Sequence, residues 1–133
     1  MAKPKSLRAV QSQFARAAAR LILHAYSLGY EVTLGDAYRD PRAPYGLKSS
    51  KHRRRLAIDL NLFRDGRYLA RTSEHRELGE WWEQHGGIWG GRWQDGNHYE
   101  WPEQGIDPSQ RPFLELPLDT HNALDLSEVE GLS

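Results

Sequence analysis

The chain has 133 residues, of which 38% are hydrophobic and 12 are glycine, as expected for a globular protein with a single domain. Eighteen Lys and Arg residues balance 18 Asp and Glu residues, so the formal net charge is zero. This balance argues against a protein that binds nucleic acid mainly by electrostatics. Because the chain contains no cysteine, disulfides and thiolate metal sites are excluded, and any metal must be bound by His, Asp or Glu.

The N-terminal part predicts a helix followed by a strand. From Ser6 to Leu28, apolar residues recur every three or four positions and arginines lie largely on the opposite side, which is typical of an amphipathic helix. Ser6 is suited to cap this helix and Gly29 to stop it. Residues 30–34 are β-branched and alternating, which indicates a strand. Prolines, glycine and serines predict a loop over residues 41–51.

The central part predicts a β-hairpin. Leucine or isoleucine stands at every second position from residue 56 to residue 62, which is the period of a strand with one buried face. Asp59 falls between these positions and therefore points away from the main core. Asp65-Gly66 is a strong turn signal, and residues 67–69 would form the returning strand.

The remaining chain predicts one more helix and one more strand. Thr72 or Ser73 can cap a helix that ends near Gly86. Residues 86–96, rich in glycine and tryptophan, read as a loop that leads into a strand at residues 98–101.

We therefore expect an α+β fold, a small single domain with a central antiparallel sheet flanked by helices. The domain would span residues 1–133, with residues 102–133 as a proline-containing C-terminal extension. The apolar stretch at residues 17–23 is far shorter than the ~18 residues of a membrane span. Residues 1–8 do not lead into the apolar core of a signal peptide. We expect no membrane insertion and no signal peptide.

His52 and Asp59 are the first pair of candidate metal ligands. Seven positions separate them, which corresponds to about 23 Å along a strand and about 10 Å along a helix. Zinc ligands lie about 2.0–2.2 Å from the ion, so the chain must bend between them, and Arg53–Arg55 would form that bend. Ala57, on the same strand face as Asp59, would leave space for a ligand.

A second cluster follows a turn near the C-terminal strand. His98 would complete a set of two histidines and one aspartate, the three protein ligands of catalytic zinc sites that leave a fourth position for water. Asp95 is then a spare carboxylate, suited to act as general base. Glu100 shares a strand face with His98 and could accept the second N–H of its imidazole. Alternatively, Asp95 is a turn residue and Glu100 a surface acid.

Arg39 is a third candidate, at the end of the strand predicted over residues 30–34. Its guanidinium could bind a substrate carbonyl or carboxylate and stabilise the oxyanion that develops during attack. Its position in the sequence is the least specific of the three signals.

These motifs resemble those of the zinc peptidase superfamily of D-alanyl-D-alanine carboxypeptidases and L-alanyl-D-glutamate endopeptidases, and especially its short endolysin-like members from phages and prophages. The similarity covers about residues 30–101. Arg55 departs from the family pattern, which often has glycine at this position. The resemblance rests on Gly35–Arg39, on Ser50-Lys51-His52 followed by Asp59, and on Asp95-Gly96-Asn97-His98-Tyr99-Glu100.

The resemblance implies a zinc peptidase that acts on the stem peptide of bacterial peptidoglycan, with L-Ala–D-Glu as the expected scissile bond. The implied site consists of the zinc ligands His52, Asp59 and His98, the base Asp95, and the substrate-contacting residues Arg39 and Ser50.

Other readings of the same residues remain open. The closest is a D-Ala-D-Ala carboxypeptidase with the same chemistry. Two histidines and a carboxylate also describe the Fe(II) site of non-haem oxygenases, and a cell-wall-binding module could retain a vestigial site. Arg53–Arg55 could contact nucleic acid, but the zero net charge favours a solvated loop. We expect a monomer that is made in the cytoplasm, acts on the cell wall and has no nucleic-acid partner.

Overall fold

The computed structural model describes residues 6–38, 40, 42, 51–107 and 109. Most of the predicted loop over residues 41–51 and most of the predicted extension over residues 102–133 lie outside this part of the chain. In chain order, the elements are α1 (Leu7–Ser27), β1 (Glu31–Leu34), the 3₁₀ helix η1 (Lys51–Arg54), β2 (Ala57–Arg64), β3 (Arg67–Tyr68), the 3₁₀ helix η2 (Thr72–His75), α2 (Arg76–Gln84), β4 (Ile88–Trp89), the 3₁₀ helix η3 (Gly90–Trp93) and β5 (His98–Glu100).

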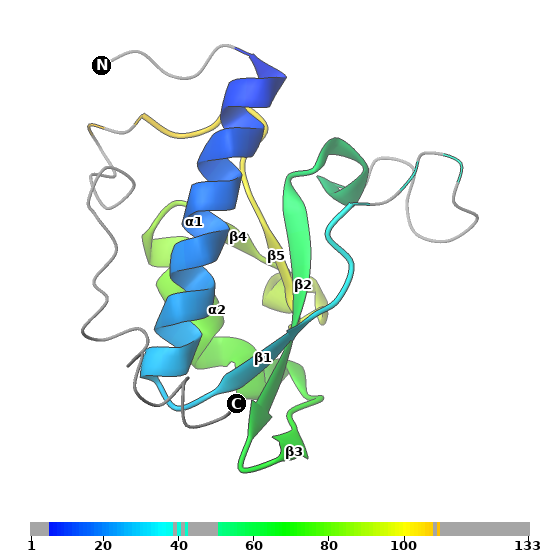
Figure 1. The fold of residues 1–133 in the computed structure, drawn as a ribbon, viewed down its shortest axis with the longest axis vertical. Helices are drawn as coiled ribbons and strands as arrows, with labels where there is room; N and C mark the ends of the chain where they lie inside the picture. The colour runs from blue at the N-terminus through cyan, green and yellow to red at the C-terminus, as the bar shows by residue number, and fades with distance from the viewer. Residues whose placement is uncertain (1–5, 39, 41, 43–50, 108, 110–133) are drawn as a thin grey trace, which may run out of the picture.

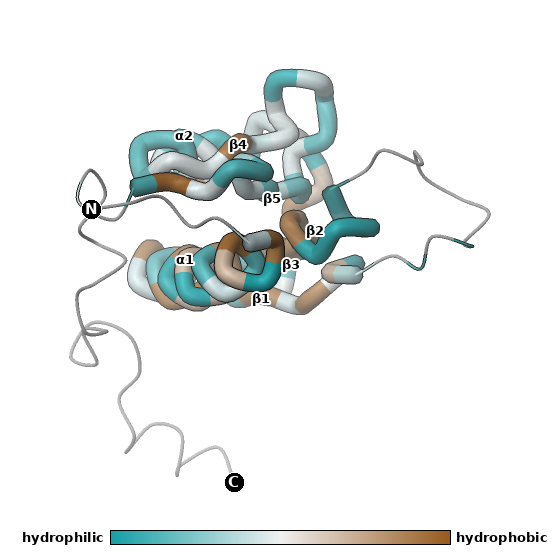
Figure 2. The backbone as a smooth tube through the Cα atoms, turned by 90° about the horizontal axis from the view of Figure 1, so that it is seen from above, coloured by the Kyte–Doolittle hydropathy of each residue, from teal (hydrophilic) through white to brown (hydrophobic). Residues whose placement is uncertain are grey.

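The five strands form one antiparallel sheet, shown in Figure 1. Its order is β1-β2-β5-β4, and β3 also pairs with β2. The two longer helices, α1 and α2, pack against the sheet, and Figure 2 shows both of them on the same side of it. The prediction of a small α+β domain with an antiparallel sheet and helices is therefore confirmed.

The pairing of β2 with β5 separates the two faces of the sheet. Ile58 lies opposite Tyr99, and both side chains are buried in the core against the helices. The next pair, Asp59 and His98, points to the other face because side chains alternate along a strand. The helices thus cover the apolar face, and the candidate metal ligands lie on the opposite face.

Helix α1 forms as the sequence predicts. The Ser6 hydroxyl accepts a hydrogen bond from the backbone N–H of Ala9 at 3.1 Å, which caps the first turn. Gly29, with φ of 91°, follows the last turn in the left-handed conformation that glycine adopts most readily. The buried face of the helix consists of Val10, Phe14, Ala17, Ala18, Leu21 and Ala25.

The hairpin prediction is also confirmed. Asp65 and Gly66 both have positive φ angles, 53° and 76°, as in the two-residue turns that match the twist of antiparallel strands. Phe63 pairs with Tyr68 and Arg64 with Arg67 across this turn.

The predicted start of the second helix is wrong. Thr72 and Ser73 lie inside η2, and α2 begins only at Arg76. A carboxylate provides the cap instead, because Glu74 accepts the backbone N–H of Arg71 at 3.1 Å. The N-cap residue of α2 is His75, which makes no capping bond with its side chain.

The predicted loop over residues 86–96 is also incorrect, because it contains β4 and η3. Trp89 is buried and its indole N–H donates to the carbonyl of Gly96 at 2.7 Å, which fixes the segment from within. Trp93 has the opposite environment, with 49% of its surface exposed. Apolar periodicity does not reveal β4 and η3 in this glycine-rich segment, because tertiary contacts rather than a periodic pattern hold these elements in place.

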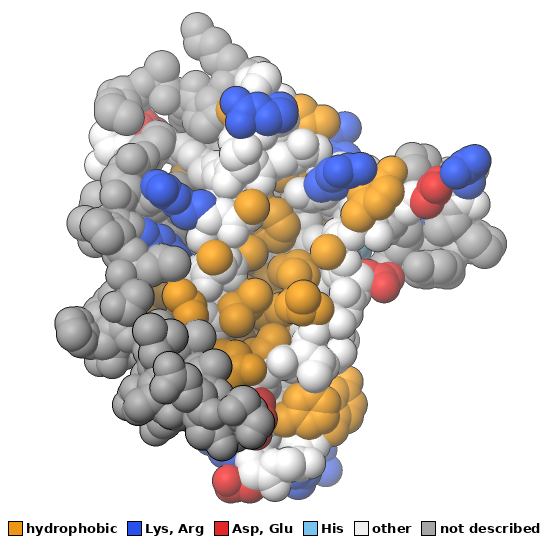
Figure 3. Space-filling model, viewed as in Figure 1, with side chains coloured by type: hydrophobic (Ala, Val, Ile, Leu, Met, Phe, Trp, Pro, Cys, Tyr) orange, Lys and Arg blue, Asp and Glu red, His pale blue; other side chains and the backbone are white. Residues whose placement is uncertain are grey.

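The face of the molecule in Figure 3 displays apolar side chains in a groove. One wall is α1, and the opposite side includes Tyr38, Arg55 and Ile58. Among the described residues that line this groove there is no carboxylate and no imidazole, so the candidate metal ligands gather elsewhere. In the part of the chain that the structure describes, neither helix has the length and hydropathy that a bilayer crossing requires.

His75 is a buried histidine outside the candidate site. Its Nε2 lies 3.3 Å from the carbonyl oxygen of Leu69, which can only accept, so this nitrogen donates. Its Nδ1 lies 2.9 Å from the Tyr99 hydroxyl, which then donates to it. A neutral imidazole satisfies both contacts. Burial is the main cause of the lowered pKa of His75, although Leu69, Glu74 and Asp95 act in the opposite direction.

This environment predicts a loss of stability on mild acidification. The folded protein resists protonation of His75, whereas the unfolded chain protonates it near its ordinary pKa of about 6.5. His75 therefore does not reduce the free energy of unfolding above pH ~6.5, and it reduces it progressively as the pH falls below that value. In chelator-treated protein, urea unfolding at pH 7 and pH 5 should show a smaller difference for His75→Gln than for the parent. An unchanged difference would contradict this account of His75.

Candidate metal centre

Three side chains from different segments meet on the open face of the sheet. They are His52 of η1, Asp59 of β2 and His98 of β5, and one ligand atom from each lies within 4.8 Å of the other two. His52 and His98 are buried, with 2% and 6% of their surfaces exposed, while Asp59 is half-buried. Such a group could hold a metal ion.

A reversal after η1 brings His52 towards Asp59. The backbone N–H of Arg55 donates to the carbonyl of His52 at 3.2 Å, and that of Leu56 to the carbonyl of Lys51 at 2.9 Å. Arg55 has φ of 60°, a conformation that costs little only for glycine, and its guanidinium packs over the Tyr38 ring at 4.3 Å. The left-handed residue that closes the bend is thus the position at which the superfamily that the motifs resemble often carries glycine.

The register of β2 and β5 and a close turn place the other ligands. Asp59 lies directly opposite His98 in the antiparallel pair. The turn before β5 packs on Gly90, whose carbonyl accepts the backbone N–H of Asp95 at 2.9 Å. A Cβ at Gly90 would lie 2.3 Å from the Asp95 carbonyl oxygen and 2.8 Å from the His98 Cβ. Only glycine lets the turn approach this closely.

The donor set fits zinc, and the two spacings from Asp59 to the imidazoles are close to those of a zinc site. Asp59 Oδ1 lies 3.1 Å from His52 Nε2 and 3.5 Å from His98 Nδ1. Ligand atoms around a tetrahedral zinc ion, at the usual bond lengths, are about 3.3 Å apart. Two imidazoles and one carboxylate also leave a fourth position for water or substrate, as in catalytic zinc sites.

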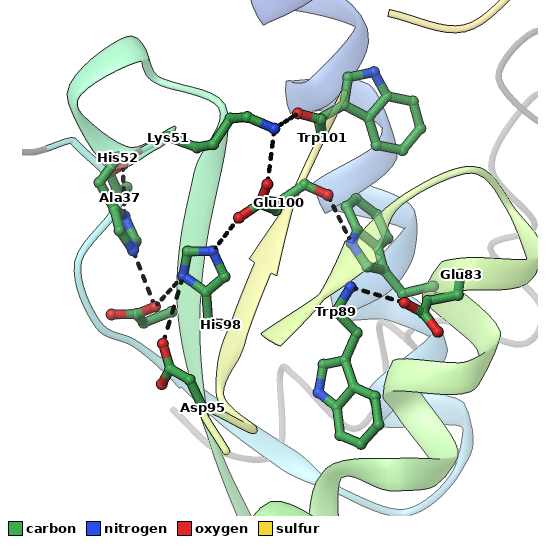
Figure 4. Close-up of polar contacts among 11 residues, drawn as sticks. Ala37, Lys51, His52, Glu83, Trp89, Asp95, His98, Glu100 and Trp101 are labelled. Atoms are coloured by element: carbon green, nitrogen blue, oxygen red, sulfur yellow. Dashed lines mark hydrogen bonds and ion pairs between the residues drawn. The ribbon is translucent and has the colours of Figure 1, made fainter. Parts of the chain in front are cut away.

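Each imidazole has a hydrogen-bond acceptor on its remote nitrogen. His52 Nδ1 lies 3.3 Å from the carbonyl oxygen of Ala37, and His98 Nε2 lies 2.8 Å from Glu100 Oε1 (Figure 4). Each remote nitrogen therefore carries a proton and donates. In the neutral rings, the lone pairs of His52 Nε2 and His98 Nδ1 then point towards Asp59, the arrangement that metal-binding histidines require.

The metal-free site binds a proton strongly. Burial alone would lower the pKa of His98, but hydrogen bonds and charges from Asp59 and Glu100 outweigh it and raise the pKa to about 9. Burial alone would raise the pKa of Asp59, but the two histidines lower it to about 2. A cation at the centre would replace this proton as the partner of Asp59, so metal binding would release a proton.

Asp95 lies beside the group of three. Its Oδ2 is 3.9 Å from His98 Nδ1, the nitrogen that also faces Asp59, and its side chain is 49% exposed. The Trp93 ring approaches His98 edge-on at 5.7 Å between centroids, and Trp93 is exposed as well. The site thus has a solvent-accessible side that carries a carboxylate and an aromatic ring.

Two of the residues singled out from the sequence, Arg39 and Ser50, lie outside the described residues, so their roles stay predictions. Conversely, the sequence indicates no role for Lys51, whose Nζ lies 2.7 Å from Glu100 Oε2. The contact joins residues 49 positions apart. A lysine next to a histidine in the sequence does not by itself indicate such a contact.

Three side chains that could hold a metal ion, with a partly exposed carboxylate beside them, make an arrangement that would suit a metal-dependent hydrolase. A protein-family model described as D-alanyl-D-alanine carboxypeptidase matches residues 46–101. The matched segment contains the three candidate ligands, Asp95 and Glu100, and it excludes α1 and β1. No curated protein matches the chain. The match supports the zinc peptidase superfamily and, in general terms, a zinc peptidase that acts on peptidoglycan peptides.

Proposed function

We propose that this protein is a zinc-dependent peptidase that hydrolyses an amide bond in peptidoglycan stem peptides, with His52, Asp59 and His98 as zinc ligands. The observation that carries the proposal is the spacing of the three ligand atoms, 3.1 Å and 3.5 Å from Asp59 Oδ1 to the two imidazole nitrogens. The match to a peptidase family over the segment that contains these residues supports it independently.

Each residue of the site then has a defined task. When bound, zinc polarises the scissile carbonyl and lowers the pKa of a water ligand from 15.7 to about 7. Asp95 accepts a proton from the attacking water and returns it to the leaving amine. Its carboxylate is 49% exposed and lies 3.9 Å from His98 Nδ1, on the accessible side of the centre, which supports this role. Glu100 orients His98 through the 2.8 Å hydrogen bond. Arg39 and Ser50 contact the substrate, and Arg39 stabilises the oxyanion.

Within this class, we propose cleavage between L-Ala and D-Glu by an endolysin-like enzyme. This assignment rests on the resemblance of the motifs to those of short phage and prophage members. The second candidate is a D-Ala-D-Ala carboxypeptidase, which the description of the matched family favours. Both activities use the same metal and the same base, so the site geometry does not separate them.

Analysis of the products separates the two activities. Purified sacculi would be digested with zinc-loaded protein and the fragments identified by mass spectrometry. The endopeptidase exposes new amino termini on D-Glu, whereas the carboxypeptidase releases free D-Ala. Chelator-treated protein provides the control and should be inactive until zinc is restored. If zinc-loaded protein produced neither product, the proposed function would be refuted.

We further propose that the whole chain forms a single peptidase domain, with residues 102–133 as an extension, and that it acts as a monomer. The protein would be made in the cytoplasm and would act on the cell wall. Sedimentation of zinc-loaded protein tests the oligomeric state, with the mass of one 15.3 kDa chain as the expected result.

A further inference from the structure

A partly buried chain of polar groups extends from the candidate metal centre to Lys51 (Figure 4). Lys51 Nζ donates to Glu100 Oε2 at 2.7 Å and to the carbonyl oxygen of Trp101 at 3.3 Å. The other carboxylate oxygen, Glu100 Oε1, accepts from His98 Nε2 at 2.8 Å. Because each oxygen has its own partner, the carboxylate is fixed from two sides. The His98 imidazole is then fixed with it.

Burial distinguishes this ion pair from others near it. The side chains of Lys51 and Glu100 are only 20% and 13% exposed. Arg54, also in η1, pairs with Glu103 at 3.1 Å, but these side chains are 47% and 51% exposed. Exposed pairs contribute little, whereas a buried charge that loses its partner carries a large penalty. Without Lys51, the Glu100 carboxylate would lose one of its two contacts and would be held only by the hydrogen bond to His98.

Lys51 also connects two segments that carry ligands. Its backbone directly precedes His52 in η1, and its ammonium group reaches Glu100 of β5, two residues beyond His98. Ala57 lies opposite Glu100 in the sheet, in the register that also sets Asp59 opposite His98. The lysine side chain therefore spans the distance between the two histidine-bearing segments.

We infer that Lys51 is a positioning residue of the metal centre, which holds Glu100 and, through it, the His98 imidazole in the orientation that binds zinc. This inference deepens the proposed function and rests on it. Lys51 makes no contact with the metal or the substrate in this account. Its effect should appear in zinc affinity, because Glu100 is the direct partner of a ligand, and disturbing such partners typically changes affinity 10–100-fold.

The first test measures the zinc affinity of the full chain by competition with a chromogenic chelator. Lys51→Met should weaken binding by about 10–100-fold. Lys51→Arg, which keeps a positive donor, should recover most of the loss. Arg54→Met is the matched control because it removes an ion pair of the same 3₁₀ helix without contact to a ligand. It should bind zinc within about twofold of the parent, as expected for the loss of an exposed pair.

The second test asks whether Lys51 acts through Glu100. In a double-mutant cycle with Glu100→Gln, adding Lys51→Met should weaken zinc binding little further, since residues in one network do not contribute additively. Urea unfolding of the metal-free variants reports any general loss of stability. Should Lys51→Met fail to fold, Lys51→Gln, which keeps a polar group, takes its place in both tests.

The outcomes separate the inference from the proposed function. Parent-like zinc affinity in the Lys51 variants, or fully additive losses with Glu100→Gln, would overturn the role of Lys51 alone. A parent protein that binds no zinc would refute the metal centre and this inference with it. A parent that binds zinc and shows the expected Lys51 effect but leaves sacculi intact would refute only the peptidase activity.

Discussion

Asp95→Asn should abolish most of the peptidase activity and leave zinc binding intact. The amide cannot accept the proton of the attacking water, and general acid–base catalysis typically contributes 10²–10⁴-fold to the rate. Asp95 is not one of the three converging ligands, and its side chain is 49% exposed. Turnover on sacculi should therefore fall by about 10²-fold or more, while the zinc content stays at one ion per chain.

Asp65→Asn is the matched control for this variant. Asp65 is also an exposed aspartate next to a glycine in a turn, but it lies in the β2–β3 hairpin. Asparagine tolerates its left-handed conformation, so activity should remain at the parent level. An Asp95→Asn enzyme as active as the parent would remove Asp95 from the mechanism, and Asp95 would then be only a turn residue.

His52→Ala should lose zinc itself. The substitution removes one of three protein ligands, and its effect should exceed the 10–100-fold change in affinity that accompanies the loss of a hydrogen-bond partner of a ligand. We expect zinc affinity to fall by more than about 100-fold and activity to disappear with it. Chelator competition measures the loss of zinc affinity, and elemental analysis after gel filtration shows whether any zinc stays bound.

His85→Ala serves as the comparison because His85 is a partly buried histidine that packs against Trp81 in α2, with ring centroids 4.3 Å apart. It should retain zinc and activity. Circular dichroism of both variants would show whether the fold persists. Stoichiometric zinc in folded His52→Ala protein would rule out His52 as a ligand.

The elements that were predicted correctly have local signals. The Ser6 cap and the apolar stripe define α1, the alternation of residues 56–62 defines β2, and Asp65-Gly66 defines the hairpin. The start of α2 and the structure within residues 86–96 were not predicted correctly. The capping contact there comes from Glu74, and β4 exists only because it pairs with β5. Pairings between distant segments leave little trace in local periodicity.

For the site, the sequence indicated which residues could act together but not how they meet. The alternation along β2 correctly placed Asp59 on the face away from the core, and the need for a bend before Asp59 followed from the rise per residue and the zinc–ligand bond lengths. The left-handed Arg55, the Ala37 carbonyl behind His52 and the ammonium of Lys51 behind Glu100 depend on tertiary contacts. No spacing rule in a single sequence could have identified them.

Anomalous diffraction at the zinc edge from crystals of the zinc-loaded protein tests the metal centre most directly. The account predicts one strong peak per chain, about 2.0–2.2 Å from His52 Nε2, Asp59 Oδ1 and His98 Nδ1. A well-ordered structure with no peak between these three side chains, or with zinc bound at a different group of residues, would contradict it.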